Sequence, residues 1–505
     1  MRPDTRANTS YRQTLRSSSI IGGSSAVNNL LSLLRIKVVA ILLGPAGVGI
    51  IGLYATVVSL IGTVAGIGLQ GSAVRAVAGA TGRSDPQAVA RTIYVLRRLC
   101  WITGSLGWLA IAVLSIPLSR IMFESTAHAS ALAILGSTIL LSAVSNGQLA
   151  LLQGLRRIGD IARVQMMVAL LNVIVAISLY AWLGDRGIVP VLVMSAAVSL
   201  SVSWWFSRRV HVAPVVLGWQ ASVAEAKPLL GLGVALTWSA VLVLAVDLLT
   251  RTLVSRELGV EASGHYQAAW ALSGLFAGFV LTAMGMDFYP RLAAIGSDRV
   301  AARRAVNEQT EIGILLALPG ILGTLALGKG VVWLFYSAEF APAVDVLVWM
   351  LLGVFGRVLS WPLGYVQLAL GAGRWFMVSE TAFHAIQAAM VLWFVSRFGL
   401  LGAAYSFAAF YALHTLGMLW IARKCIGFCW SLASIKLIGV AIGFIAIAFA
   451  VNRTLTDWHA VAVGCAISIV GALFSIRGLV ARLGNDHWLA GWVRKFSCML
   501  NFEKV

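Results

Sequence analysis

The stretch Leu30–Gly49, LLSLLRIKVVAILLGPAGVG, shows the pattern on which the rest of the chain is built. It is an apolar run long enough to cross a membrane as a helix, and it closes on the turn Gly44-Pro45. Two cations, Arg35 and Lys37, interrupt it. Charge at membrane depth is costly, so each cation is expected either to extend toward an interface or to serve a function.

The composition of the whole chain agrees with a membrane protein. Of 505 residues, 59% are hydrophobic and 11% are charged, and the mean hydropathy is +0.89. A water-soluble protein of this length has no place for so much apolar side chain on its surface. The formal net charge of +19 does not indicate nucleic-acid binding, because the cations lie between apolar segments rather than in a basic patch with interleaved aromatics.

Apolar runs of membrane-spanning length recur along the chain. A helix needs about 20 residues to cross the hydrocarbon core, and about fourteen such runs are bounded by charges, Gly or Pro. The sequence therefore predicts an all-α polytopic membrane protein with spans at 17–43, 48–78, 92–118, 127–155, 162–183, 188–207, 229–255, 263–290, 308–335, 341–370, 375–397, 400–422, 434–452 and 459–477.

The distribution of Lys and Arg predicts the orientation of these spans. With the N-terminus in the cytoplasm, most of these cations fall in the inner tails and loops, and few fall in the outer loops. This asymmetry follows the positive-inside rule. We therefore expect a multi-pass protein with both termini in the cytoplasm.

Glycines at turns between predicted spans recur at a fixed interval. Gly44 and Gly49 recur at an offset of 215 as Gly259 and Gly264. Gly184 and Gly187 recur at the same offset as Gly399 and Gly402, and Gly154 and Arg157 recur at 217 as Gly371 and Arg374, which predicts a small insertion. The interval contains an even number of spans, so both copies have the same orientation. We predict two parallel six-helix lobes around a central cleft, with two further helices at the C-terminus.

The predicted domain boundaries follow from this repeat. The N-lobe is expected at 1–207 and the C-lobe at 228–424, joined by a basic cytoplasmic loop at 208–227. The last two helices and a cytoplasmic tail occupy 425–505.

Arg357 is the most deeply placed cation. It lies about 20 Å or more from either end of the predicted span 341–370, too far for easy extension to an interface. Arg357 could be a cation of a substrate cavity or a partner of an internal ion pair, and both roles fit this position.

Arg35 and Lys37 are two residues apart, about 200° around a helix, so they face different sides. We favour a functional role for one of them and extension to the interface for the other.

Two pairs of ionisable groups at membrane depth have chemistry suited to a transporter. Asp247 and Arg251 are four residues apart, which fits either a cleft cation or a neutralised pair near an interface. Glu380 and His384 have the same spacing, and a carboxylate beside a histidine is suited to carrying a proton. Solvation at the inner end of the span is the alternative for this second pair.

The sequence contains no pattern of an enzyme or a metal protein. The five cysteines are scattered along the chain without nearby His or carboxylate partners, so we interpret them as packing residues. Nucleophile-base pairs and phosphate-cradling loops are also absent, and no cofactor is expected.

Three stretches, 42–78, 258–276 and 337–380, resemble the O-antigen and lipid-linked-oligosaccharide translocases (Wzx-type flippases) of the multidrug/oligosaccharidyl-lipid/polysaccharide exporter superfamily. The likeness follows the same order over most of the first twelve spans. It implies two six-helix lobes forming a V, and transfer of an undecaprenyl-pyrophosphate-linked glycan through a cationic cleft to the periplasmic leaflet. It also implies residence in the bacterial inner membrane, a role in O-antigen and lipopolysaccharide synthesis, and work alongside a polysaccharide polymerase and a chain-length regulator.

The resemblance also implies site residues. The family's basic positions are matched at Lys37, Arg251 and Arg357, and its Gln and Glu at Gln267 and Glu380. Arg35 is not clearly part of this pattern but remains a candidate for the cleft. Val354 stands where similar proteins often carry an acidic residue, so no coupling role is assigned there. If transport is driven by H⁺ or Na⁺, the predicted carriers are Asp247, Glu380 and His384.

Two other functions remain as alternatives. A multidrug exporter of the same superfamily would need acidic groups for cationic drugs, whereas the deepest groups here are basic. A membrane-embedded polysaccharide polymerase or ligase would need a sizeable outer loop with acid/base residues, whereas the predicted outer loops are short.

Overall fold

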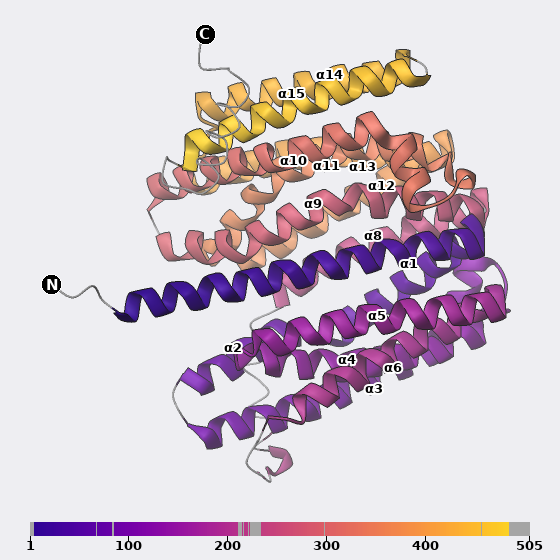
Figure 1. The fold of residues 1–505 in the computed structure, drawn as a ribbon, viewed down its shortest axis with the longest axis vertical. Helices are drawn as coiled ribbons and strands as arrows, with labels where there is room; N and C mark the ends of the chain where they lie inside the picture. Colours follow the sequence, from indigo (N-terminus) through magenta and orange to yellow (C-terminus); the bar gives the residue numbers. More distant parts are fainter. Residues whose placement is uncertain are drawn as a thin grey trace. The chain divides into compact units, whose positions relative to one another are not determined.

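The computed structural model describes residues 5–66, 68–82, 85–210, 215, 217–220, 222, 234–296, 298–455 and 457–483. The predicted inter-lobe loop 208–227 and the tail beyond 483 fall largely outside these residues. The described part is helical without β-strands, and its elements are α1 (Thr5–Gly66), α2 (Leu69–Gly82), α3 (Pro86–Phe123), α4 (Ala129–Gly154), α5 (Ile158–Leu183), η1 (Gly184–Gly187), α6 (Ile188–Ser207), α8 (Val234–Leu258), α9 (Val260–Ile295), α10 (Arg299–Phe335), η2 (Ala338–Phe340), α11 (Ala343–Ala369), α12 (Gly373–Phe398), α13 (Leu400–Ile426), α14 (Leu432–Thr454) and α15 (Asp457–Leu483) (Figure 1).

The prediction of an all-helical, multi-span membrane protein is confirmed. Within the described residues, eleven helical segments are long and apolar enough to cross a membrane. One of them, Leu30–Gly66, overlaps the predicted spans 17–43 and 48–78, and another, Ile158–Ser207, includes the predicted spans 162–183 and 188–207. The first is broken at Gly44, whose φ of 61° and ψ of −171° are not helical, and the second is broken by η1. The number of membrane crossings, predicted as fourteen, stays a prediction.

One predicted span is wrong in its extent. The sequence predicts a continuous span over 48–78, but α1 ends at Gly66 and α2 begins at Leu69. Between them Gly68 has a φ of 67°, a backbone conformation that glycine adopts without steric cost. An apolar run gave no sign of this break, because hydropathy does not report backbone conformation.

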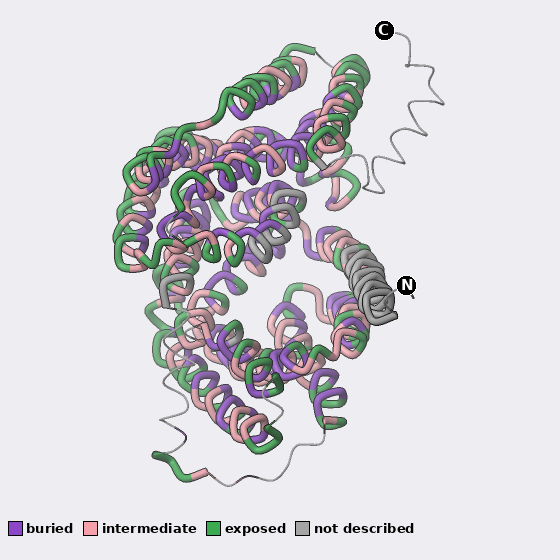
Figure 2. The backbone as a smooth tube through the Cα atoms, turned by 90° about the vertical axis from the view of Figure 1, so that its left-hand side faces the viewer, coloured by how far each residue is buried: buried purple, intermediate pink, exposed green. Residues whose placement is uncertain are grey.

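The outer faces of the helices carry apolar side chains, as a lipid solvent requires. Along α3, Leu106, Leu109, Val113 and Ile116 are all more than half exposed and lie on one face of the helix. Water would penalise such a stripe, whereas hydrocarbon does not. Figure 2 shows the alternation of buried and exposed residues along the helices.

The chain forms two compact units. Unit 1 contains residues Met1–Gly264 and Phe335–Ser337, and unit 2 contains His265–Leu334 and Ala338–Val505. In unit 1, α3 packs on α4, α4 on α6, and α1 on α5 and α8; Figure 1 shows α3 to α6 side by side. Unit 1 therefore includes α8 in addition to the first six predicted spans, and the predicted lobe boundaries at 207 and 228 stay a prediction.

Each unit has its own apolar core. The core of unit 1 includes fully buried Leu53, Val57, Ile111 and Leu135 from α1, α3 and α4. In unit 2, α13 packs on both α11 and α12. Its core includes Phe288, Val306, Leu363, Met418 and Phe428.

The internal repeat is visible in the backbone as left-handed turns. Positive φ values occur at Gly44 and Gly259 (61° and 89°), and at Gly184 and Gly399 (54° and 58°), each pair related by the offset of 215. A third pair at this offset is Arg156 and Gly371, with φ values of 55° and 73°. The turn at Gly371 therefore repeats in register at Arg156, which corrects the predicted interval of 217 and removes the need for an insertion at this turn.

Candidate functional site

Arg35 and Lys37 point toward different neighbours, as their spacing on the helix requires. Lys37 Nζ donates a hydrogen bond to the backbone carbonyl oxygen of Tyr336, in the segment after α10. Arg35 instead interacts electrostatically with Tyr180 of α5. Both cations are half-buried. The break at Gly44 lies two turns further along α1, so both cations lie near this end of their helical segment.

Arg251 of α8 reaches the same place as Lys37. Its guanidinium is buried and donates through Nε to Asp247 Oδ2 at 2.9 Å. Arg251 also interacts with the Tyr336 phenol, whose pKa is raised mainly by burial and lowered in part by this positive charge. Lys37 and Arg251 therefore converge on Tyr336, and the structure brings together two of the predicted cations.

Asp247 neutralises only part of this charge. Its Oδ2 atom accepts from Arg251 and, at 3.4 Å, from Thr56 of α1. Its other oxygen, Oδ1, is buried without a hydrogen-bond partner among the described residues. The group therefore includes two basic side chains, Lys37 and Arg251, and one carboxylate, which bonds to Arg251.

A cavity of about 540 Å³, with a mainly apolar lining, lies between α1, α2, α3, α4 and α8 of unit 1. Its polar lining is uncharged and consists of hydroxyl and amide groups, among them Ser59, Thr63, Ser142, Asn146 and Thr237. Such groups can both donate and accept hydrogen bonds. The same helices, α1 and α8, carry Lys37 and Arg251.

In unit 2, Arg357 has an aromatic neighbour and no carboxylate partner within the described residues. Its Cζ atom lies 5.9 Å from the centre of the Tyr411 ring on α13, and the side chain is half-buried. A cation over an aromatic face is held by the ring quadrupole without being neutralised. Of the two interpretations left open by the sequence, an internal ion pair has no support here.

Glu380 lies between two histidines. His384 Nδ1 is 3.9 Å from Glu380 Oε2, and His414 Nε2 is 3.8 Å from Glu380 Oε1. The side chains of Glu380, His384 and His414 are only 8%, 7% and 12% exposed. His414 Nδ1 is buried without a partner among the described residues. The group is a buried carboxylate that shares its environment with two titratable rings.

Tyr411 connects this carboxylate to Arg357. The Tyr411 and His414 rings lie 5.9 Å apart on α13, and both Arg357 and Glu380 interact electrostatically with Tyr411. The structure thus brings Arg357 of α11 and the pair Glu380 and His384 of α12 around one face of α13. Gln267 lies half-buried on α9 of the same unit.

Several contributing groups could not be found from the sequence. Tyr336 contributes a backbone carbonyl, which no motif reports. The i,i+3 spacing of Tyr411 and His414 was the only signal that the sequence offered for that pair. The described chain contains no group of three or more His, Cys, Asp or Glu residues placed to hold a metal ion.

Comparisons with known proteins identify similar sequences and folds. The profile of the family described as "Polysaccharide biosynthesis protein" matches residues 38–345. The lipid III flippase of Escherichia coli (strain K12) is 22% identical over 388 residues, which cover 75% of this chain and 90% of that protein. A multidrug resistance MATE family transporter of the MOP superfamily, in its inward-facing conformation, aligns with a TM-score of 0.65 at 15% identity over 81% of this chain and 96% of that one. The lipid II flippase MurJ, inward closed, aligns with a TM-score of 0.63 at 14% identity over 91% of this chain and 98% of that one.

Proposed function

The chain belongs to the polysaccharide biosynthesis protein family, whose profile matches residues 38–345, and from this premise we propose that it flips a lipid-linked oligosaccharide. The proposed substrate is an undecaprenyl-pyrophosphate-linked repeat unit of O-antigen or exopolysaccharide, moved from the cytoplasmic to the periplasmic leaflet of a bacterial inner membrane. The family resemblance expected from the sequence is confirmed. Similarity to the lipid III flippase over 90% of its length supports the substrate class.

Arg357 is the observation that carries this proposal. An arginine midway along a membrane helix is expensive, and Arg357 lies over the Tyr411 ring with no carboxylate partner among the described residues. A pyrophosphate group cannot cross hydrocarbon unaided, since even one charged side chain at the bilayer centre costs about 3 kcal/mol or more. Arg357 supplies a positive charge at that depth, so the headgroup binds there instead of facing hydrocarbon.

Lys37 and Arg251 provide the second basic group. Together with Asp247 they carry a net positive charge beside Tyr336. Guanidinium and ammonium groups are the standard protein ligands for phosphate. We assign phosphate or sugar contacts to Lys37 and Arg251, and sugar contacts to the uncharged cavity lined by Ser59, Asn146 and Thr237.

The proposed cycle is alternating access. The two lobes predicted from the repeat rock so that the cationic cleft opens to one leaflet and then to the other, while the prenyl tail stays in lipid. Internal repeats of parallel orientation are the usual basis of such a movement. The distribution of Lys and Arg supports the proposal that both chain termini lie in the cytoplasm.

Proton antiport is the proposed driving force, with the Glu380 cluster as its carrier. Glu380 is flanked by His384 and His414 at 3.9 and 3.8 Å. Two imidazoles favour a proton over Na⁺ as the coupling ion, because imidazole titrates near neutral pH and is a poor ligand for hard cations. Asp247, with one unpartnered oxygen within the described residues, is the proposed second carrier.

A liposome assay distinguishes this function from export of drugs. The purified protein is reconstituted and supplied either with a labelled undecaprenyl-pyrophosphate glycan or with organic cations. Transfer of the glycan lipid across the bilayer without change in its covalent structure is the expected result. Transport of the organic cations alone, or chemical conversion of the glycan, would contradict the proposal.

A further inference from the structure

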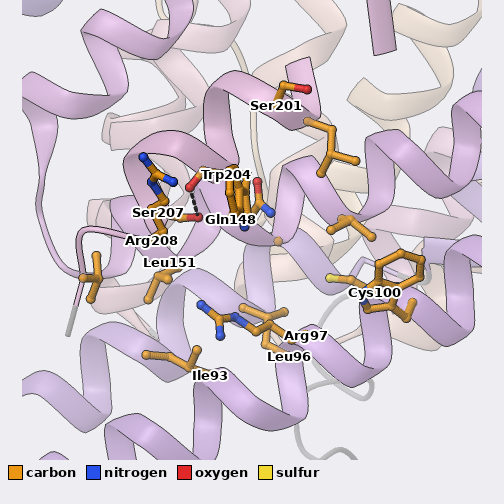
Figure 3. A pocket seen from close by; sticks show the side chains of 15 residues that line it. Ile93, Leu96, Arg97, Cys100, Gln148, Leu151, Ser201, Trp204, Ser207 and Arg208 are labelled. Carbon is orange, nitrogen blue, oxygen red and sulfur yellow. Dashed lines mark hydrogen bonds between the residues drawn. The ribbon is translucent and has the colours of Figure 1, made fainter. Parts of the chain in front are cut away.

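A second cavity in unit 1 lies outside the site described above. It has a volume of about 680 Å³ and lies between α3, α4 and α6 (Figure 3). This cavity shares three lining residues, Leu96, Cys100 and Gly147, with the 540 Å³ cavity on the α1 and α8 side. These three residues therefore form a wall between the two cavities, with the α3–α6 cavity on one side and the 540 Å³ cavity on the other.

Two arginines from different helices line this cavity. Arg97 belongs to α3, and Arg208 follows the last residue of α6; both are exposed. Neither forms an ion pair with a carboxylate among the described residues, and no acidic residue lines the cavity. Arg208 instead lies over the rings of Trp204 and Trp205, with its Cζ atom 4.9 and 4.0 Å from their centres. The site therefore offers two charges that have not been neutralised.

An amide inside the cavity adds a neutral donor. Gln148 accepts a hydrogen bond through Oε1 from Ser203 at 2.6 Å, and Ser203 is fully buried. Because its carbonyl oxygen is occupied in this way, the NH₂ group of Gln148 is the part left to bind a ligand. Figure 3 shows Gln148 beside Trp204 and Arg208 in the cavity.

Most of the other residues that line the cavity are apolar, and the cations predict that it lies at the depth of a membrane interface. α4 ends at Gly154 and α6 at Ser207, so the cavity is at the helix ends that the cations predict to be cytoplasmic. Trp101 and Trp204 line it and are each about half exposed, as aromatic residues at headgroup level are. Ile93, Leu96 and Leu151 are buried behind these rings, and the exposed rings form an apolar wall suited to an acyl chain.

We propose that this cavity binds the phosphate headgroup of an anionic glycerophospholipid of the cytoplasmic leaflet. Two guanidinium groups and an amide NH₂ match the oxygens of a phosphodiester, and the apolar wall matches the adjoining acyl chain. The wall formed by Leu96, Cys100 and Gly147 separates the cavity from the α1 and α8 side, where the transported lipid is assigned. The bulk phospholipid is therefore the occupant, and the prenyl pyrophosphate is not.

Native mass spectrometry of the purified protein tests this proposal. The full chain is released from micelles and titrated with phosphatidylglycerol, phosphatidylcholine or undecaprenyl phosphate. We expect at least tenfold tighter binding of phosphatidylglycerol than of phosphatidylcholine, and a tenfold loss in the double variant Arg97→Gln/Arg208→Gln. Arg209→Gln is the matched control, because it removes an exposed positive charge one residue away without touching the cavity.

A second variant tests whether binding needs the space of the cavity in addition to its two positive charges. Ser201→Trp adds an indole at a residue that lines the cavity while both arginines remain, and it is expected to reduce phosphatidylglycerol binding as the double variant does. An equal loss in Arg209→Gln, or full binding in Ser201→Trp, would overturn the proposal in favour of a diffuse surface charge. Binding of undecaprenyl phosphate but not of phosphatidylglycerol would overturn it in favour of a substrate site. None of these measurements depends on transport. Failure of the lipid-binding proposal is therefore distinguishable from failure of the proposed function.

Discussion

Gly264 packs directly against the backbone of Pro45, so closely that a Cβ atom on Gly264 would overlap the Pro45 carbonyl oxygen. The approach is reciprocal, since a Cβ atom on Gly49 would lie 2.9 Å from the Gly264 nitrogen. Gly49 and Gly264 are equivalent positions of the repeat, related by the offset of 215. The two copies of the turn therefore contact each other within unit 1, and glycine is required there because no side chain fits.

The first prediction concerns this contact. Gly264→Ala is expected to destabilise the protein by about 1–3 kcal/mol, because the added methyl group forces the two backbones apart. Gly274→Ala, on the same helix with open space around it, is the control and should be neutral or slightly stabilising. Thermal unfolding in detergent measures both; a Gly264→Ala protein as stable as the unmodified one would refute the close approach.

The second prediction concerns the buried pair Asp247 and Arg251. Asp247→Asn leaves a guanidinium that is 2% exposed without its carboxylate, and breaking a buried pair costs about 3–5 kcal/mol. The double variant Asp247→Asn/Arg251→Gln removes the uncompensated charge and should recover a large part of that loss. A double variant less stable than Asp247→Asn, measured by thermal unfolding, would show that the carboxylate does not serve to neutralise Arg251.

The third prediction separates the two cations of the stretch 30–49. Lys37→Ala should reduce glycan-lipid transport strongly, because it removes the ammonium group beside Tyr336 and Arg251. Arg35→Ala, which loses an interaction with Tyr180 on another face, should retain most of the activity. The measurement is surface glycan assembly at equal protein abundance. Equal loss in both variants would contradict the assignment of Lys37 alone to the cleft.

Part of this account could be predicted from the sequence and part could not. The helical spans and the repeat of Gly44 at Gly259 follow from hydropathy and glycine spacing, which depend on local residues. The partner turn of Gly371 was sought at Gly154, yet the backbone places it at Arg156, a residue whose side chain gives no sign of a left-handed turn. Tyr336 and Tyr411 were missed because their roles come from tertiary contacts, one of them through a backbone carbonyl.

The fourth prediction concerns proton coupling. Glu380→Gln removes the only carboxylate that His384 and His414 face among the described residues. It should abolish the stimulation of transport by an imposed proton gradient while substrate exchange without a gradient persists. Glu308→Gln, an exposed carboxylate of α10, is the control. Unchanged stimulation in Glu380→Gln would place the coupling elsewhere or show that there is none.

The central claim is that an unneutralised cation at the depth of Arg357 carries the pyrophosphate, and transport by Arg357 variants in proteoliposomes tests it most directly. Arg397, exposed at the end of α12, provides the matched control. At equal reconstitution, Arg357→Ala should lose flipping of the undecaprenyl-pyrophosphate glycan, Arg357→Lys should keep part of it, and Arg397→Ala should behave as the unmodified protein. Flipping by Arg357→Ala at the rate of the unmodified protein would contradict the account.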